Sequence, residues 1–454
     1  MIQLQLRSCS LLAAFVAFAT ACAINPAKSA QPDIVLIVAD DLGWGDLACF
    51  GSDEVQSPAL DALASEGQRW TNFYANCCVC SPTRASILTG CYPDRVGVPG
   101  VIRTNASNSW GKLKSGVAML PALLQQAGYQ TAAIGKWHLG LTTQDHPVRR
   151  GFDHFHGFLG DMMDDYYDHR RQTNNYMRLG DTPINPSGHA THLFENWAKL
   201  AIDKMETQDA PYFLYLAFNA PHTPIQPPSS ALDNVRKRLP GVSDKRAKLI
   251  ALIEDMDASI GRVLERVKQT QRETLIIFVS DNGGQLNVGA DNGPLRGGKQ
   301  SKYEGGIRVP AIVKWTGKIP AGSSTDAIGV TMDLMPTICQ ALQLERPSSI
   351  DGKSLMPWLT NPAKAPGQRE VYYVRREGGP AYCGLTIEAL RKGDWKLVHN
   401  LPTEPMQLFN LAKDPYETTD LASTNRKQMR EMMNTLMKHI QAAGQVPWQP
   451  AADK

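Results

Sequence analysis

The chain has 454 residues, of which 43% are hydrophobic and 20% charged, with 37 Gly and 30 Pro. This composition is typical of a globular protein and excludes a disordered, collagen-like or coiled-coil chain. The formal net charge is +3, and it falls to +1 from Gln31 onward, so bulk charge gives no support to nucleic-acid binding.

The first thirty residues have the features of a secretory signal. Arg7 precedes a mostly apolar run from Leu11 to Ala23, which is shorter than the roughly 20 residues that span a bilayer. We therefore expect an exported protein, periplasmic or secreted, with no integral membrane span. Lipid anchoring at Cys22 is an alternative, but the three residues before Cys22 make a poor lipoprotein signal.

Four short apolar runs are rich in β-branched and aromatic residues, and each stops at a polar cluster. They are 34–38 before Asp40 and Asp41, 130–134 before Lys136 and His138, 212–218 before His222, and 275–279 before Asp281 and Asn282. Apolar residues at helical spacing lie between them, for example over 57–67 and 249–267. The alternation predicts an α/β fold with a large, doubly wound, mixed but mostly parallel sheet and helices on both faces. Ligands bind beyond the carboxyl ends of such strands, so the four clusters should converge on one site.

The pattern changes after Pro310. We expect a helix over 333–342, a loop-rich stretch over 347–366, and short strands at 371–374, 385–391 and 395–399. Gly393 and Asp394 are typical of a hairpin turn, and a final helix is expected over about 425–443. These elements predict a small C-terminal antiparallel sheet packed with a terminal helix. The expected domains are a signal peptide (1–30), a catalytic α/β domain (31–365) and a C-terminal subdomain (366–454).

Seven cysteines lie beyond the signal, and four of them fall within 77–91. Export permits disulfides, but the spacing gives no connectivity. A zinc cluster is the alternative. It is disfavoured because no CxxC pair recurs downstream at the spacing of a structural zinc site.

The paired residues Asp40-Asp41 and Asp281-Asn282 favour a metal site. Adjacent buried carboxylates repel each other unless a cation compensates, and Gly283 and Gly284 allow close backbone approach. One pair alone would be read as a turn or helix cap. Two pairs at equivalent strand ends form an all-oxygen set, which suits Ca²⁺ or Mg²⁺ better than Zn²⁺.

The run Cys80-Ser81-Pro82-Thr83-Arg84 is expected to open a short helix that Gly90 ends, with Ser81 as N-cap and Pro82 in the first position. Cys80 would then lie at a positive helix terminus with Arg84 on the same side, in an anion pocket. Taken alone, this context suggests an activated thiolate nucleophile.

The stretch 80–90 resembles the signature of the sulfatase family of the alkaline-phosphatase-like superfamily, in which the Cys is converted to formylglycine after synthesis. One departure in this stretch is Thr83, where Ser is commoner. Similar family patterns occur at 40–41, 135–140, 221–224, 280–283, 298–299, 304–306, 351–355, 408–411 and 414–417. The resemblance covers nearly all of the chain beyond the signal. It implies the alkaline-phosphatase-like fold, sulfuric ester hydrolysis and a formylglycine-generating maturation enzyme as a partner.

The same resemblance implies a nucleophile and a cofactor. Hydrated formylglycine made from Cys80 would offer one hydroxyl to attack sulfur and a second to expel sulfate. A divalent cation, calcium in preference to magnesium, would polarise a sulfate oxygen, and Asp281 could accept a proton. The implied metal ligands are Asp40, Asp41, Cys80, Asp281 and Asn282.

The resemblance also implies roles for basic residues. Arg84, Lys136 and Lys299 would neutralise charge on the sulfuryl oxygens, and Lys136, His222 and Lys299 would bind substrate. His222, with Lys299, would protonate the leaving oxygen, and His138 would take the second hydroxyl's proton.

The substrate is expected to be a sulfated small molecule or glycan, and a carbohydrate sulfate is favoured over an aryl or steroid sulfate. Specificity should come from the loops 161–178 and 285–296, and His154 and His156 could line the substrate side of the cleft. No nucleic-acid partner is expected.

Four other functions compete with the sulfatase interpretation. The nearest is a phosphodiester or phosphonate monoester hydrolase of the same superfamily. A two-zinc phosphomonoesterase would need His ligands that this chain lacks. A binding protein would not need the His and Lys residues beside the metal site, and a papain-like hydrolase would not need the acidic cluster.

Overall fold

A ten-stranded mixed sheet forms the centre of the fold. The computed structural model describes residues 31–109 and 111–444, so the predicted signal peptide lies outside the described residues. The strand order is β13 (Ser323–Thr325), β2 (Gln68–Trp70), β12 (Ala311–Trp315), β11 (Thr274–Ser280), β1 (Asp33–Ala39), β10 (Tyr212–Ala217), β4 (Gln130–Lys136), β5 (His154–Phe158), β8 (Met177–Leu179) and β9 (Thr182–Pro183). The five strands from β11 to β5 are parallel, which confirms the predicted mixed, mostly parallel sheet.

The four apolar runs expected to form the large sheet became its four central strands, β1, β4, β10 and β11. Their pairing register places their carboxyl ends at the same level. Ala39 of β1 pairs with Ser280 of β11, and Val38 of β1 pairs with Ala217 of β10. Because the strands are parallel, their carboxyl ends lie at one edge of the sheet. The polar clusters that follow them therefore meet there, as expected.

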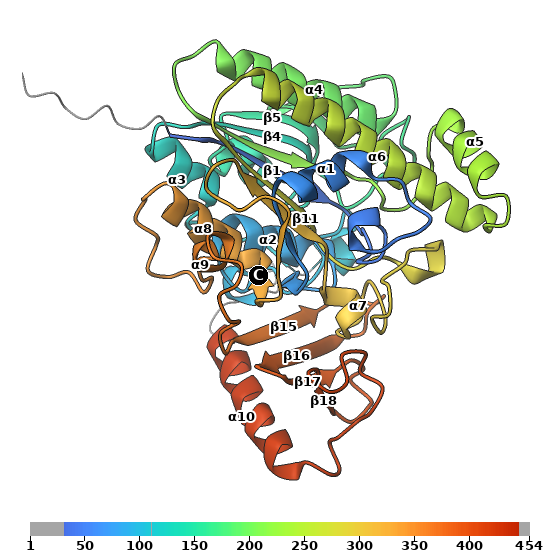
Figure 1. Ribbon diagram of the computed structural model, residues 1–454, viewed down its shortest axis with the longest axis vertical. Coiled ribbons are helices and arrows are strands. Elements are labelled where there is room, and N and C mark those ends of the chain that lie inside the picture. The colour runs from blue at the N-terminus through green and yellow to red at the C-terminus, as the bar shows by residue number, and fades with distance from the viewer. Residues whose placement is uncertain (1–30, 110, 445–454) are drawn as a thin grey trace, which may run out of the picture. The chain divides into compact units, whose positions relative to one another are not determined.

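Helices cover both faces of the sheet (Figure 1). Alternate residues of β1 belong to two separate cores, with Leu36 and Val38 in one and Val35 and Ile37 in the other. The first core includes α2 (Cys80–Thr89), α3 (Leu120–Gln126) and α8 (Leu334–Ala341). The second includes α1 (Pro58–Glu66), α4 (Ala190–Glu206), α5 (Ser229–Arg238) and α6 (Asp244–Gln269). Because a strand's side chains alternate between faces, this division is what a doubly wound sheet requires.

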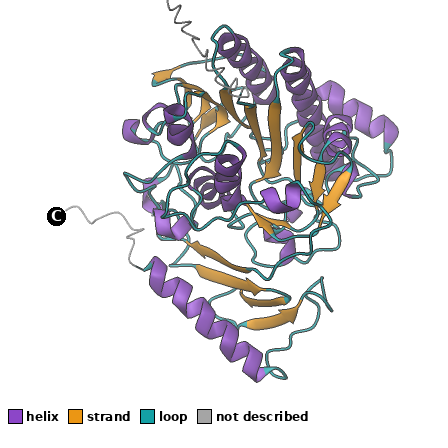
Figure 2. Cartoon of the chain, turned by 60° about the vertical axis from the view of Figure 1, so that its left-hand side comes forward, coloured by secondary structure: helices purple, strands orange, loops and turns teal. Residues whose placement is uncertain are grey.

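The C-terminal part contains a four-stranded antiparallel sheet and a long helix, α10 (Arg426–Ala443), that runs along it (Figure 2). The strands are β15 (Glu370–Arg376), β16 (Thr386–Lys392), β17 (Trp395–His399) and β18 (Gln407–Asn410). Three of them and the hairpin at Gly393 and Asp394 were predicted, whereas β18 was not. The chain from Pro32 onward forms one compact unit, so the domain boundary at 365/366 stays a prediction.

The start of α2 differs from the expectation. The helix begins at Cys80, and Val79 is its N-cap residue. Ser81 was predicted to cap it, but the Ser81 Oγ accepts a hydrogen bond from the backbone N–H of Ile102 at 3.0 Å. The Ser81 hydroxyl therefore binds a residue distant in sequence and does not cap the helix. Gly90 ends the helix in the left-handed conformation (φ 69°), as predicted.

The seven cysteines of the described residues are all free thiols, and six of them are wholly or largely buried. Within residues 31–109 and 111–444, no helix is both long and apolar enough to cross a membrane.

Candidate active site

The predicted metal ligands meet at the carboxyl end of the sheet. Asp40 and Asp41 follow β1, and Asp281 and Asn282 follow the neighbouring β11; all four are buried. The Asn282 Nδ2 donates to the Asp41 Oδ1 at 2.7 Å, and the Asp41 backbone N–H donates to the Asp281 Oδ1 at 3.3 Å. Two strand ends distant in sequence thus form one cluster of oxygen atoms.

Each of the three carboxylates has its own cation. The Arg84 Nε donates to the Asp281 Oδ2 at 2.9 Å, and the Lys136 Nζ is ion-paired with Asp40. The third ion pair joins the Lys299 Nζ to the Asp41 Oδ2 at 2.6 Å. Buried charges are tolerated only when they are paired, so the acidic cluster and the cations depend on each other.

Neighbouring charges push the pKa values of two carboxyls in opposite directions. Burial and the charge of Asp40 raise the pKa of Asp281 to about 7. Burial also opposes ionisation of Asp40, but the charges of Lys136 and Arg84 outweigh it and hold the pKa of Asp40 well below its usual range. Asp40 is therefore permanently ionised, whereas Asp281 can take up or release a proton near neutrality.

Cys80 is not an activated thiolate in this structure. Its side chain is buried, and its thiol donates to the Asp40 Oδ1 at 3.3 Å. Burial and the charge of Asp40 raise the pKa of the thiol well above its ordinary value, despite the nearby Lys136. The expectation from the helix terminus alone is therefore wrong, because desolvation and an adjacent carboxylate outweigh the positive helix end. An unmodified Cys80 is a poor nucleophile here.

The two predicted catalytic histidines are held in defined tautomers. The His138 Nε2 lies 2.9 Å from the carbonyl oxygen of Ile102, which can only accept, so Nε2 carries the ring proton. Its Nδ1 is buried without a hydrogen-bond partner among the described residues. Burial and the charge of Lys136 lower the pKa of His138 well below its usual value. His138 is thus neutral, with a free lone pair that can accept a proton.

His222 has the opposite tautomer. Its Nδ1 lies 2.7 Å from the carbonyl oxygen of Thr223, and its Nε2 lies 2.9 Å from the Lys299 Nζ. Burial and the charge of Lys299 lower the pKa of His222. The neutral ring therefore accepts a hydrogen bond from the Lys299 ammonium. His222 and Lys299 form a pair that can share this proton.

These groups line a pocket of about 240 Å³. Cys80, His138, His222 and Lys299 contribute to its wall. Both loops predicted to govern specificity also contribute, and their residues are Asp161, Met162, Arg171 and Gln285. Four further polar residues that line the pocket were not predicted. One is Gln300, which follows Lys299, and the other three are Arg103, Arg375 and Tyr382.

Arg103, Arg375 and Tyr382 form a connected group. The Arg103 guanidinium lies over the Tyr382 ring, 4.1 Å from its centroid, and pairs with Glu377 at 2.8 Å. Arg375 lies on β15 and also pairs with Glu377, at 2.9 Å. No local pattern marks them, because their contribution depends on how the C-terminal sheet packs against the segment that follows α2.

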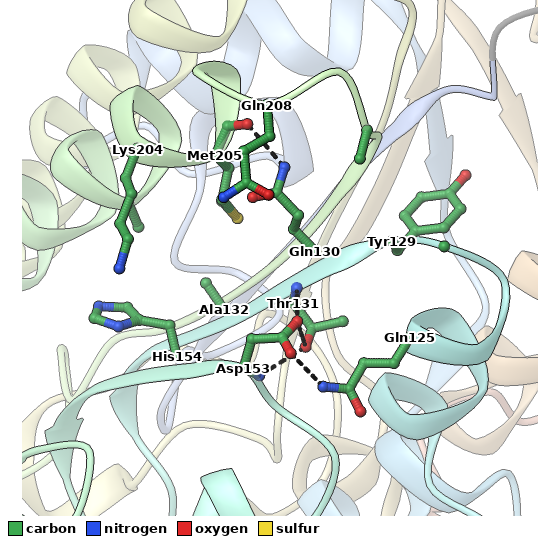
Figure 3. Close-up of a pocket in the computed structure, with 13 residues that line it drawn as sticks. Gln125, Tyr129, Gln130, Thr131, Ala132, Asp153, His154, Lys204, Met205 and Gln208 are labelled. Carbon is green, nitrogen blue, oxygen red and sulfur yellow. Dashed lines mark hydrogen bonds between the residues drawn. The ribbon is translucent and has the colours of Figure 1, made fainter.

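His154 and His156 do not line this pocket, contrary to expectation. His154 pairs with Ala132 near the start of β4, at the amino end of the strand, whereas Lys136 ends that strand. It lies in a different pocket, of about 470 Å³, beside Asp153 and Lys204 (Figure 3). His156 stacks on Trp197 with 3.5 Å between ring centroids. Their place at the start of a parallel strand puts them away from the carboxyl ends.

The site contains a cluster of side chains that could hold a metal ion. Ligand atoms of Asp40, Asp41, Cys80 and His222 lie within 4.8 Å of one another. The Asn282 Oδ1 is buried and has no hydrogen-bond donor among the described residues. A buried amide oxygen without a partner, beside carboxylates, is what an oxygen-coordinated divalent cation would satisfy.

Comparison with known proteins identifies the family. The model of the sulfatase domain matches residues 32–344. The chain belongs to the sulfatase family. This sulfatase is therefore a sulfuric ester hydrolase, and its fold is the alkaline-phosphatase-like one predicted from the sequence. A second model, described as N-sulphoglucosamine sulphohydrolase, C-terminal, matches residues 298–445.

Similar proteins support the assignment along most of the chain. N-acetylgalactosamine-6-sulfatase of Sus scrofa is 33% identical over 80% of this chain and 71% of its own length. Arylsulfatase G of Homo sapiens is 31% identical over 78% of this chain and 73% of its own. The crystal structure of Ps i-CgsB in complex with k-i-k-neocarrahexaose matches with a TM-score of 0.83 and 30% identity, over 93% of this chain and 95% of that one.

Proposed function

We propose that this sulfatase removes sulfate from a hydroxyl of a sulfated carbohydrate, outside the cytoplasm. The observation that carries the substrate class is the lining of the pocket near Cys80, where Arg103, Arg171 and Arg375 lie beside Asp161 and Tyr382. Guanidinium, carboxylate and phenol groups suit sugar hydroxyls and anionic substituents, whereas an aryl or steroid ester would be better matched by an apolar wall. The similarity to a galactosamine-6-sulfatase and to an enzyme crystallised with an oligosaccharide supports the same class.

Cys80 is proposed to act after conversion to formylglycine by a maturation enzyme. The modification would supply hydroxyl groups at a position where the thiol stays protonated and weakly nucleophilic. The hydrogen bond from Cys80 to Asp40 supports this assignment, because it places the side chain at the edge of the oxygen cluster.

Calcium is the proposed metal, with Asp40, Asp41, Asp281 and Asn282 as its ligands and the modified Cys80 beside them. It would supply positive charge that polarises a sulfate oxygen. The all-oxygen set of the four residues favours calcium over zinc, and the tolerance of calcium for irregular cages favours it over magnesium.

The chain's own residues would handle charge and protons. Arg84, Lys136 and Lys299 are proposed to stabilise charge on the sulfuryl group, with Lys136, His222 and Lys299 as its binding residues. The His222–Lys299 pair would deliver a proton to the leaving oxygen. His138, whose Nδ1 presents a free lone pair, would accept the proton that must leave when sulfate is released, and Asp281 is a second acceptor.

The C-terminal part, which we divide from the catalytic domain at 365/366, is proposed to contribute to substrate binding. Arg375 and Tyr382 both come from it. Export, with the signal over 1–30, would bring the enzyme to glycans outside the cytoplasm.

The experiment that tests this function is sulfate release from defined sulfated mono- and oligosaccharides, with an aryl sulfate and an aryl phosphodiester as comparisons. At least one glycan should have a higher kcat/KM than the aryl sulfate, and the phosphodiester should be the poorest substrate. Inert glycans beside rapid turnover of the aryl sulfate would reject the carbohydrate assignment alone. Peptide mass spectrometry of the same preparation should show an aldehyde or its hydrate at Cys80, and fully active enzyme with an intact thiol would reject the nucleophile.

A further inference from the structure

A second cluster of ligating side chains lies between α4 and α6, and it shares no residue with the catalytic pocket. His189 immediately precedes α4, His192 lies in its first turn, and Asp255 lies on α6. One ligand atom from each residue lies within 4.8 Å of the other two. Two imidazoles and a carboxylate are typical ligands of zinc and similar transition-metal ions, in contrast to the oxygen set of the catalytic site.

The tautomer of His189 prepares it to bind a cation. Its Nε2 lies 3.0 Å from the carbonyl oxygen of Gln226, and a carbonyl can only accept a hydrogen bond. The ring proton is therefore on Nε2, and Nδ1 of the neutral ring presents a lone pair. Metal-binding histidines almost always donate their other nitrogen in this way, which fixes the ring orientation. The Tyr166 ring also stacks on His189, with 5.1 Å between centroids.

Two of the ligand atoms are buried without a partner. The His189 Nδ1 and the Asp255 Oδ2 have no hydrogen bond among the described residues, although they face each other at 3.8 Å. His189 is only 3% exposed. Two acceptors that face each other in a buried place repel each other unless a proton or a cation lies between them.

A metal ion would replace one existing hydrogen bond. The His192 Nε2 lies 2.8 Å from the Asp255 Oδ1, at hydrogen-bond distance, and an ion bound to both residues would take the place of the proton between them. The His192 side chain is 41% exposed, which leaves the cluster open to solvent for entry of an ion and for a water as fourth ligand.

We infer that His189, His192 and Asp255 form a binding site for a divalent transition-metal ion of the zinc type, separate from the catalytic calcium site. An ion there would join α4 to α6 and hold Gln226 through His189. It would also brace Tyr166, whose hydroxyl donates to the backbone carbonyl of His222 at 2.8 Å. The site is therefore structural, and it supports the segment that carries a predicted catalytic residue.

The test is zinc binding to the full-length, calcium-loaded enzyme, measured by titration calorimetry with zinc chloride in excess calcium. Wild type should bind one zinc ion. His192→Ala and Asp255→Asn should bind zinc more than about 100-fold more weakly, a larger loss than is usual for a residue that only contacts a metal ligand. The matched control is His146→Ala, because His146 pairs with Asp181 at 2.7 Å in a site with a single histidine. It should bind zinc as wild type does.

Anomalous diffraction at the zinc edge from soaked crystals locates the ion. A peak about 2.0–2.1 Å from the His189 Nδ1 and the His192 Nε2 supports the inference. A peak found only at Asp40 and Asp41 overturns it, as does equal zinc affinity in wild type and His192→Ala. Without zinc, His192→Ala and Asp255→Asn should unfold at the same temperature as wild type. When zinc is added, only wild type and His146→Ala should gain stability.

Discussion

The Lys299 Nζ lies 2.9 Å from the His222 Nε2 and 2.6 Å from the Asp41 Oδ2, so a single ammonium joins an imidazole to a carboxylate at the wall of the pocket. Burial opposes the charge on Lys299, but Asp41 outweighs it and raises the pKa of Lys299 above its ordinary value. Lys299 is therefore protonated at neutral pH and keeps the lone pair of His222 occupied. The Lys299–His222 pair is suited to deliver a proton to the leaving oxygen. This matters most when the leaving group is a weakly acidic alcohol, such as a sugar hydroxyl.

The first prediction follows from that pair. Lys299→Met should lower kcat for a sugar sulfate by about 10²- to 10⁴-fold, the usual contribution of acid–base catalysis. The loss should be smaller for an aryl sulfate with an acidic phenol, because its leaving oxygen needs no proton. Steady-state rates on the two substrates measure the difference. The exposed Lys353→Met is the control and should leave both rates unchanged. Equal losses on both substrates would argue against proton delivery by this pair.

The second prediction concerns the proposed calcium. Asn282→Leu should weaken calcium binding by more than about tenfold and lower activity in parallel, because it removes the buried amide oxygen that has no other partner. Calcium-dependent activity after chelation gives the affinity. The exposed Asn361→Leu should behave as wild type. Activity that follows one equivalent of zinc instead of calcium would contradict the assignment.

The third prediction concerns a buried charge cluster that joins α7 (Glu304–Ile307) to the C-terminal sheet. The Lys396 Nζ lies 2.7 Å from Glu304 and 2.8 Å from Glu417, and all three side chains are buried. Burial opposes the ionisation of Glu304, but Lys396 holds its pKa at about 2. Lys396→Met would remove the nearest cation from two buried carboxyls, of which only Glu304 keeps a second cation, Arg308 at 3.8 Å, and it should lower the free energy of unfolding by about 3–5 kcal/mol.

The control for this variant is Lys392→Met on the neighbouring strand. Lys392 pairs with Glu370 at 3.3 Å, but its side chain is 53% exposed, so its loss should cost less than about 1 kcal/mol. Denaturant unfolding of both variants makes the comparison. If Lys396→Met and Lys392→Met had similar free energies of unfolding, the buried cluster would not join α7 to the C-terminal sheet.

The fourth prediction concerns pH. Asp257 on α6 accepts the backbone N–H groups of Ala59 and Leu60 at the start of α1, at 3.0 and 2.9 Å. Burial raises the pKa of Asp257 to about 6 in the folded state, above its ordinary value of 3.8. Its contribution to stability is therefore fully present below pH 4 and is lost as the pH rises through 6, by up to about 3 kcal/mol.

Asp257→Asn removes this titration. The free energy of unfolding of the variant relative to wild type should rise between pH 4 and 6 and then stay level. Urea unfolding at a series of pH values measures it. A difference that is constant across this range would mean that Asp257 has an ordinary pKa.

Much of the fold was predictable because its signals are local. The apolar runs that became β1, β4, β10 and β11 are continuous, as buried parallel strands require. β18 was missed because its four residues carry no clear alternation, and only pairing with β17 defines it as a strand. Ser81 was misassigned as a cap because Ile102, distant in sequence, takes its hydroxyl oxygen.

The sequence by itself determined the family, the central strands and which strand ends carry charged residues, because a strand's polar terminus and the 80–90 motif are contiguous in the chain. Tertiary structure decided which of those charges pair, the protonation of Cys80 and Asp281, and the contribution of Arg103, Arg375 and Tyr382 to the pocket. It also brought His189, His192 and Asp255 together. These properties depend on burial and on distances of a few ångströms between residues far apart in the chain, and charge interactions at such distances vary too steeply with position to be read from spacing.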